Sequence, residues 1–308
     1  MRRSVPLSAW VALVALLASG IALVAMLAVS EEAEAAFPGQ NGRVALCTSN
    51  GSSIHSVTSG GSGYRPEVPA ASEYTCDPSY SPDGTKLAFT SDRDGDYDIY
   101  VKDLASGQVT QITKDGEWSG VPDRRPAWSP DGTRMVFDDQ NDIWVMDASD
   151  GSDRVRLTDT AAVHEWQAAW SPDGARIAFQ LEDDLWVMDA NGSNRKNLTR
   201  TPALEDSYPS WSPNGGRIAW AKQSATDSPN DVWKMRADGS GKVRLTSLAG
   251  HEGAPAWSPN GTKIAYIKDA QGDTDVWKMN ASDGSQKASI TNNDFDEFYP
   301  DWQPKPAP

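Results

Sequence analysis

Acidic side chains recur at one position of a phrase that the chain repeats. The phrase is an aromatic residue followed by Ser-Pro, then Asp or Asn, then Gly, and Trp302 stands in a similar setting near the C-terminus. Its aromatic residues are Tyr80, Trp128, Trp170, Trp211 and Trp257. The residue five positions earlier is Thr75 in the first unit and a carboxylate in the other units, namely Asp123, Glu165, Asp206, Glu252 and Glu297.

Carboxylates that converge in a partly desolvated cleft attract cations and raise one another's pKa. These residues lie in loops that lead into repeated strands, so we expect them to form a negative ring on one face. Such a ring predicts binding of a metal ion, a polyamine or a basic protein segment. The alternative is that each acid caps its own turn or bonds to the neighbouring repeat.

Two histidines directly precede members of this predicted ring. His164 stands before Glu165, and His251 stands before Glu252. Imidazole is a common ligand of transition metals, so these histidines are candidate ligands for Mn²⁺ or Zn²⁺. A metal held here predicts a lyase or hydrolase that acts on polysaccharide.

A run of alternating acids is a second candidate metal site. In the segment "SDRDGDYDIY", Asp92, Asp94, Asp96 and Asp98 flank Gly95. Carboxylate oxygens at such spacing can bind Ca²⁺, although the glutamate expected at the twelfth loop position is missing. The other interpretation is a hairpin turn between two strands.

Two tryptophans outside the predicted strands are candidate ligand-stacking residues. Trp118 and Trp166 lie in loops before the repeated phrase. Ten other tryptophans lie on predicted repeat strands, where packing explains them.

The elements that position these residues repeat with the phrase. A second motif of the type "DIWVMD" and a third of the type "LT" follow each copy, and successive aromatic markers are 41 to 48 residues apart. A period of 40–50 residues with several short strands is typical of a β-propeller. Within a unit, "PAWS" is an inner strand, Ser-Pro-Asp-Gly is a tight turn and "RMVF" is the returning strand.

The chain ends complete the count of units. The segment "YPDWQP" near the C-terminus supplies an inner strand, and "NGRVALC" from Asn41 supplies a second strand that lacks a first. Joined together they form one blade and leave no open sheet edge. We therefore expect an all-β, six-bladed propeller of four-stranded blades over residues 37–303, with a proline-rich tail at 304–308.

The repeated pattern resembles the TolB-like propeller repeat, which also occurs in prolyl-oligopeptidase-type and tricorn-type proteases. The resemblance covers essentially all residues after Phe37. It implies the propeller fold and a role in a complex of the cell envelope. TolB proper has an α/β domain before its propeller and the peptidases have a hydrolase domain, and neither is expected here.

The termini and the charge narrow the function. Arg2, Arg3 and an apolar run over 9–29 make residues 1–36 either a cleaved signal peptide or a membrane anchor, and both place the propeller outside the cytoplasm. Cys47 and Cys76 are the only cysteines, and we expect a disulfide that reinforces ring closure. A formal charge of −15 disfavours nucleic acid as a partner.

The sequence thus predicts a monomeric, non-catalytic propeller that binds a protein, peptide or cell-envelope ligand on an acidic face. The G-x-S-x-G motif of serine hydrolases is missing from the sequence. We expect no obligatory cofactor, although a divalent cation (Ca²⁺, Mn²⁺ or Zn²⁺) is a candidate ligand. We expect the protein to contact the membrane only through its N-terminal segment. The alternatives are the metal-dependent lyase or hydrolase and a structural module of the cell surface.

Overall fold

The strands of this protein follow one another in repeated groups of four. The computed structural model describes residues 39–48, 52–114, 122–160, 163–201, 204–224, 229–247, 250–269 and 272–305. All of them belong to one compact unit, Ala35–Pro308. Residues 1–36, for which a signal peptide or anchor is predicted, lie outside the described residues. Among the described residues there is no helix long and apolar enough to cross a membrane.

Six four-stranded antiparallel sheets form the blades. Blade 1 contains β4 (Thr75–Tyr80), β5 (Lys86–Ser91), β6 (Asp98–Asp103) and β7 (Val109–Gln111). Blade 2 contains β8 (Asp123–Trp128), β9 (Arg134–Asp139), β10 (Asp142–Asp147) and β11 (Val155–Arg156). Blade 3 contains β12 (Glu165–Trp170), β13 (Arg176–Leu181), β14 (Asp184–Asp189) and β15 (Lys196–Asn197).

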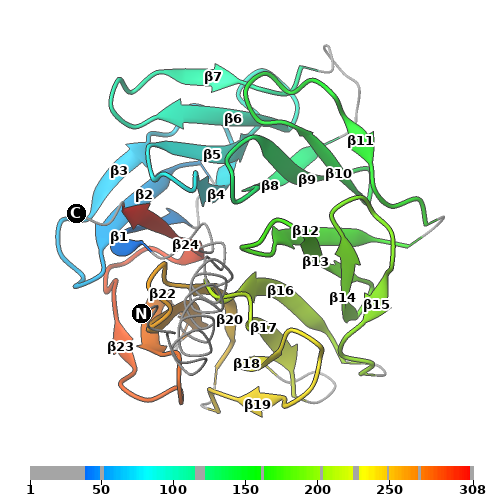
Figure 1. The fold of residues 1–308 in the computed structure, drawn as a ribbon. Coiled ribbons are helices and arrows are strands. Elements are labelled where there is room, and N and C mark those ends of the chain that lie inside the picture. Colours follow the sequence, from blue (N-terminus) through cyan, green and yellow to red (C-terminus); the bar gives the residue numbers. More distant parts are fainter. Residues whose placement is uncertain are drawn as a thin grey trace, which may run out of the picture. The chain divides into compact units, whose positions relative to one another are not determined.

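The ring continues through two more blades and a closing blade. Blade 4 contains β16 (Asp206–Trp211), β17 (Arg217–Gln223), β18 (Asn230–Arg236) and β19 (Val243–Arg244). Blade 5 contains β20 (Glu252–Trp257), β21 (Lys263–Asp269), β22 (Thr274–Asn280) and β23 (Ala288–Ser289). The closing blade contains β24 (Glu297–Lys305), β1 (Gln40–Thr48), β2 (Ile54–Thr58) and β3 (Arg65–Val68). Figure 1 shows β4, β8, β12, β16, β20 and β24 around the centre of the ring.

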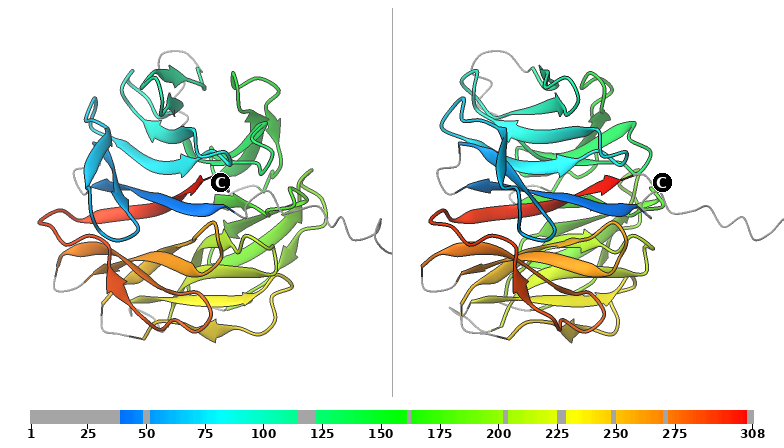
Figure 2. Two further views of the ribbon diagram at one scale, coloured as in Figure 1. Left: turned by 60° about the vertical axis from the view of Figure 1, so that its left-hand side comes forward. Right: turned by 90° about the vertical axis from the view of Figure 1, so that its left-hand side faces the viewer.

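The two chain ends meet in the closing blade, as predicted. Strand β1 pairs with β24 in antiparallel register, with Val44 opposite Trp302, and Figure 2 shows the blue β1 beside the red β24. The predicted tail, however, begins too early. Pro304 is buried and Lys305 pairs with Gln40, because β24 extends two residues past the expected boundary.

The repeated phrase links each blade to its neighbour. The indole Nε1–H of Trp128 donates to the Ser79 carbonyl oxygen of the preceding blade at 3.2 Å. Trp211 makes the same bond to Ala169 at 3.2 Å. The glycine of the following turn has a left-handed backbone that L side chains rarely adopt, as in Gly132 with φ 72°. The phrase thus supplies contacts between neighbouring blades as well as the turn within a blade.

The second and third motifs of each unit are also joined. The Thr113 hydroxyl accepts the Ile99 amide hydrogen at 2.9 Å and donates to the Asp98 carboxylate at 2.7 Å. Thr199 makes the same two bonds, to Leu185 and Asp184, at 2.9 Å each. This bond pair gives the recurring Asp and Thr a structural role.

Each inner strand contains a β-bulge in the same place. The bulge lies shortly before the aromatic residue of the repeated phrase. In β4, for example, two residues separate Cys76 from Ser79, whereas one residue separates their partners on β5. The bulge residue, three positions before the aromatic, has a positive φ in every blade. These residues are Asp77, Arg125, Gln167, Tyr208, Ala254 and Tyr299, and we call them the pocket ring.

The predicted disulfide is present. Cys47 of β1 and Cys76 of β4 are bonded, with their Cα atoms 5.2 Å apart. Cys47 lies within β1 and Cys76 within β4, so the bond joins the closing blade to blade 1.

Candidate functional site

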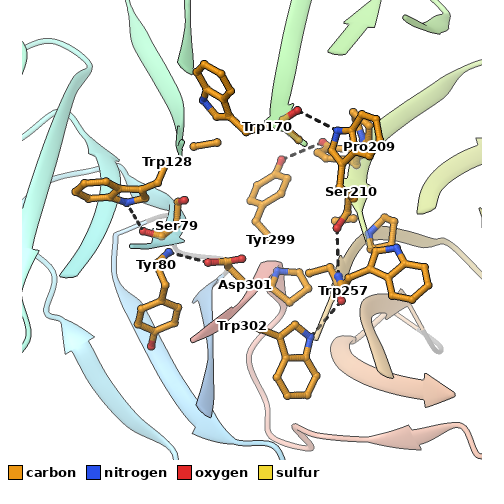
Figure 3. Close-up of a pocket in the computed structure, with 18 of the residues that line it drawn as sticks. Ser79, Tyr80, Trp128, Trp170, Pro209, Ser210, Trp257, Tyr299, Asp301 and Trp302 are labelled. Carbon is orange, nitrogen blue, oxygen red and sulfur yellow. Dashed lines mark hydrogen bonds between the residues drawn. The ribbon is translucent and has the colours of Figure 1, made fainter. Parts of the chain in front are cut away.

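All six inner strands contribute to one central cavity. Its volume is about 300 Å³, and the whole pocket ring lines it. Most of the remaining wall consists of prolines and of the aromatic residues of the repeated phrase. Figure 3 shows Tyr299 in the middle of this cavity, while the indoles of Trp128 and Trp302 point outward from it. The cavity wall is therefore largely apolar, with polar groups supplied by the pocket ring.

The bulge is what directs pocket-ring residues into the cavity. Each sheet of a propeller stands edge-on to the central axis, so ordinary strand side chains point toward neighbouring blades. An extra residue with left-handed backbone breaks this alternation and re-aims one side chain. The ring is chemically uneven, because it contains an acid, a base, an amide, two phenols and a methyl group.

Arg125 is the basic member of the pocket ring. Its Nη1 lies 2.7 Å from Oδ2 of Asp138 on β9. Burial opposes the charged form of Arg125, but Asp138 and Asp77 outweigh it and raise its pKa. Burial raises the pKa of Asp138 to about 6, although Arg125 favours its ionised form. The two groups are thus an ion pair above about pH 6.

Two tyrosines meet across the cavity. The hydroxyl oxygens of Tyr208 and Tyr299 are 3.3 Å apart, and their ring centres are 5.6 Å apart. The blade between them has only Ala254 at this position, which leaves room for the contact. The Tyr208 amide hydrogen is bonded to Oε1 of Gln167 at 2.6 Å. Pocket-ring groups therefore couple three blades, namely blade 3, blade 4 and the closing blade.

Two carboxylates also line the cavity. Asp77 is 8% exposed and accepts a hydrogen bond from the Tyr74 hydroxyl at 3.1 Å. Asp301 is partly buried, and its Oδ2 accepts the Tyr80 amide hydrogen at 2.7 Å. Burial raises the pKa of Asp301 to about 7, against the opposing effect of the Tyr80 and Trp302 amides.

The five carboxylates singled out in the sequence lie elsewhere. Each begins an inner strand instead of lying in the loop before it, and each is only 0–1% exposed; the five are Asp123, Glu165, Asp206, Glu252 and Glu297. The expected negative ring at the channel mouth is thus wrong in its geometry. These residues precede the bulge, so their side chains stay in the regular strand pattern and point into the protein.

Hydrogen bonds and ion pairs hold these carboxylates in place. Oδ1 of Asp206 accepts from Nε1 of Trp220 at 2.6 Å, and Asp123 is paired with Arg154. Glu297 accepts from Thr291 at 2.6 Å and from Asn293 at 2.5 Å. Burial raises the pKa of Glu297 to about 7. The alternative interpretation, bonds within and between blades, therefore describes these contacts better.

The structure does not bring the two histidines into a metal-binding group. His164 is exposed, and its Nδ1 lies 2.6 Å from Oδ1 of Asn141. His251 is partly buried, which lowers its pKa. Neither residue lines the cavity or belongs to a cluster of three or more potential ligands among the described residues.

The acidic run does gather three carboxylates. Oxygens of Asp94, Asp96 and Asp98 lie within 4.8 Å of one another, whereas Asp92 accepts the Tyr74 amide hydrogen at 2.9 Å. Burial and the two neighbouring acids raise the pKa of Asp98 to about 6. Asp98 also makes the structural bond to Thr113 described above, so calcium binding at this turn stays a prediction.

Of the two candidate stacking residues, Trp166 is described by the structure and does not line the cavity. Trp118 lies outside the described residues. Trp166 is the second residue of β12, and its ring stacks on His164 with 5.4 Å between ring centres. The guanidinium carbon of Arg125 is 5.8 Å from the centre of the Trp166 ring. Trp166 therefore packs behind the pocket ring without lining the cavity.

The sequence contains a signal for the pocket ring, although the members of the ring share no residue type. The residue after the ring position is Pro in five blades and Ala168 in the other, and the aromatic follows two residues later. The ring position itself varies freely in chemistry. Packing between blades does not fix the residue type at a position that varies beside a constant phrase. Such a position is free to bind a ligand.

Comparisons with known proteins agree with this architecture. The family model described as TolB beta propeller domain matches residues 49–183 and 122–306. A comparison with curated proteins found no match.

Solved structures show the same fold. TolB from Acinetobacter baumannii is 23% identical with a TM-score of 0.74, covering 87% of this chain and 68% of that one. A putative TolB from Agrobacterium tumefaciens is 19% identical with a TM-score of 0.66, covering 87% and 99%. An oligogalacturonate lyase in complex with manganese is 15% identical with a TM-score of 0.53, covering 83% and 74%. Since the family model spans well over half of the sequence, the chain belongs to the TolB beta-propeller family.

Proposed function

We propose that this protein is a non-catalytic binding propeller that recognises a segment of a protein or peptide partner in its central cavity. The pocket ring is the observation that carries the proposal. At the same position of all six inner strands, a residue other than glycine adopts a left-handed backbone. Five of these six residues bring a polar side chain to the shared cavity. Strained positions of this kind cluster at ligand-binding sites.

An extracytoplasmic location is part of the proposal. The Cys47–Cys76 disulfide supports it, because such bonds persist in oxidising compartments. The arginines and the apolar run over 9–29 support it independently as an export signal. The likeness to structures called TolB agrees with a role at the cell envelope.

Site-specific photocrosslinking tests the site. Tyr208 is replaced by p-benzoylphenylalanine in the full-length protein, which is then irradiated in the envelope fraction of the producing cell. The matched control carries the same group at Phe295, which is 48% exposed and does not line the cavity. We expect a discrete crosslinked product from position 208 only. A product of equal yield from position 295, or from that position alone, would contradict the proposal.

A further inference from the structure

Two of the cavity carboxylates lie at one junction of the ring. Asp301 of β24 accepts the amide hydrogen of Tyr80 on β4 at 2.7 Å, and Asp77 precedes Tyr80 by three residues on the same strand. Figure 3 shows Asp301 reaching toward Tyr80 at the edge of the cavity. The junction between the closing blade and blade 1 therefore presents two acids to one space.

The charge of Asp301 is not needed for the hydrogen bond that it makes. At the junction of blades 4 and 5, Ser210 occupies the same repeat position and accepts the Trp257 amide hydrogen at 3.2 Å. The remaining blades have Ser79, Ala127, Ala169 and Ala256 at this position. A blade can therefore fold with a neutral hydroxyl or a methyl group at this position. Only the closing blade has a carboxylate there.

The cavity has an excess of negative charge. Its charged lining residues are Asp77, Arg125 and Asp301. Arg125 is already paired with Asp138 at 2.7 Å. Burying acids against prolines and aromatic rings costs free energy unless a cation joins them. A cationic group entering the cavity offsets that cost.

Resting on the function proposed above, we infer that the cavity accepts a lysine side chain of the partner. Its ammonium group would lie between Asp77 and Asp301, and its methylene groups would pack against the proline-rich wall. A cavity of about 300 Å³ is at the small end of ligand pockets, which suits one side chain better than a folded element.

Peptides of one length and different charge test the inference. Acetyl-Ala-Lys-Ala-amide is titrated into the full-length protein by calorimetry, beside the same peptide with norleucine or glutamate in place of lysine. Two variants are compared with the wild type. Asp301→Ser keeps an acceptor for the Tyr80 amide, as Ser210 shows, and removes the charge. Glu73→Gln removes a carboxylate that is exposed and does not line the cavity.

We expect the lysine peptide to bind at least about tenfold more tightly than the norleucine peptide. Asp301→Ser should weaken the lysine peptide by about tenfold, and Glu73→Gln should leave its affinity unchanged. Equal affinity for lysine and norleucine overturns the inference but keeps the cavity as the binding site. Failure of the lysine peptide to bind also overturns it, and the crosslink at position 208 then decides separately whether the proposed function stands.

Discussion

At the scale of single residues, the pocket-ring position takes a backbone conformation that glycine adopts most easily. None of the six blades has glycine there. Holding a residue other than Gly, Asn or Asp in this region costs about 1–3 kcal/mol. The side chains at this position are therefore retained against a local preference, which agrees with a role in ligand binding.

Ala254 offers a direct test of this strain. Its φ is 44°, and its methyl group makes none of the polar contacts of the other ring members. We expect Ala254→Gly to change the free energy of unfolding by between zero and about 1 kcal/mol in the stabilising direction, because relief of strain offsets the greater freedom of the unfolded chain. The matched variant Ala265→Gly lies in the regular strand β21 and should destabilise by about 1 kcal/mol or more. Urea denaturation measures both, and a loss at 254 as large as that at 265 would show that no strain is present.

Asp301 predicts a pH dependence of stability. Its pKa is raised from 3.8 to about 7 by burial. A carboxyl group with a raised folded-state pKa contributes its stability below its unfolded pKa and loses it as the pH rises through about 7. Asp301→Asn removes this titration and retains an acceptor for the Tyr80 amide. Relative to the wild type, the variant should therefore become more stable by roughly 2–3 kcal/mol as the pH rises from 5 to 8. Thermal melts across this range check it, and a constant difference in melting temperature would refute the assignment.

At the scale of elements, the repeated phrase was sufficient to predict every blade. The glycine of its turn approaches a proline of the preceding blade, as Gly132 approaches Pro82 and Gly174 approaches Pro130, so one copy identifies the others. The pocket ring could not be found in this way, because its members share a backbone conformation and not a residue type. Assigning Glu165 and its equivalents to entry loops placed them on an open face, whereas each is the buried first residue of an inner strand.

The glycine of an outer turn shows how closely neighbouring blades approach. Gly192 follows β14 with φ 85°, and a Cβ atom there would lie 2.7 Å from the Leu157 carbonyl oxygen of blade 2. Gly107 follows β6 with φ 76°, and a Cβ atom there meets nothing within 4 Å. Gly192→Ala should lower the free energy of unfolding by about 2 kcal/mol or more through overpacking, and Gly107→Ala by about 1 kcal/mol through backbone strain alone. Chemical denaturation compares the two, and equal losses would mean that blade contact adds no cost.

At the scale of the whole molecule, ring closure depends on β24, which enters the ring from the far end of the chain. Strand β24 pairs with β1, where Phe298 lies opposite Cys47. Cys47 is in turn bonded to Cys76 of β4, the inner strand of the next blade. The disulfide joins elements only 29 residues apart in sequence, so it does not fasten β24 itself. Instead, it fixes the distance between β1 and β4, the two strands against which β24 must dock.

Removal of the disulfide should therefore weaken closure without changing the fold. We expect the double variant Cys47→Ser with Cys76→Ser to lose about 3 kcal/mol of unfolding free energy, because the unfolded chain regains the freedom of the closed loop. Both cysteines are almost fully buried, at 1% and 3% exposure. Reductant should therefore reach the bond only in unfolded molecules, and it should then lower the denaturation midpoint of the wild type. The variant should not respond to reductant at all. Identical guanidinium midpoints for the wild type and the variant would show that β24 docks as firmly without the bond, and that its hydrogen bonds to β1 alone close the ring.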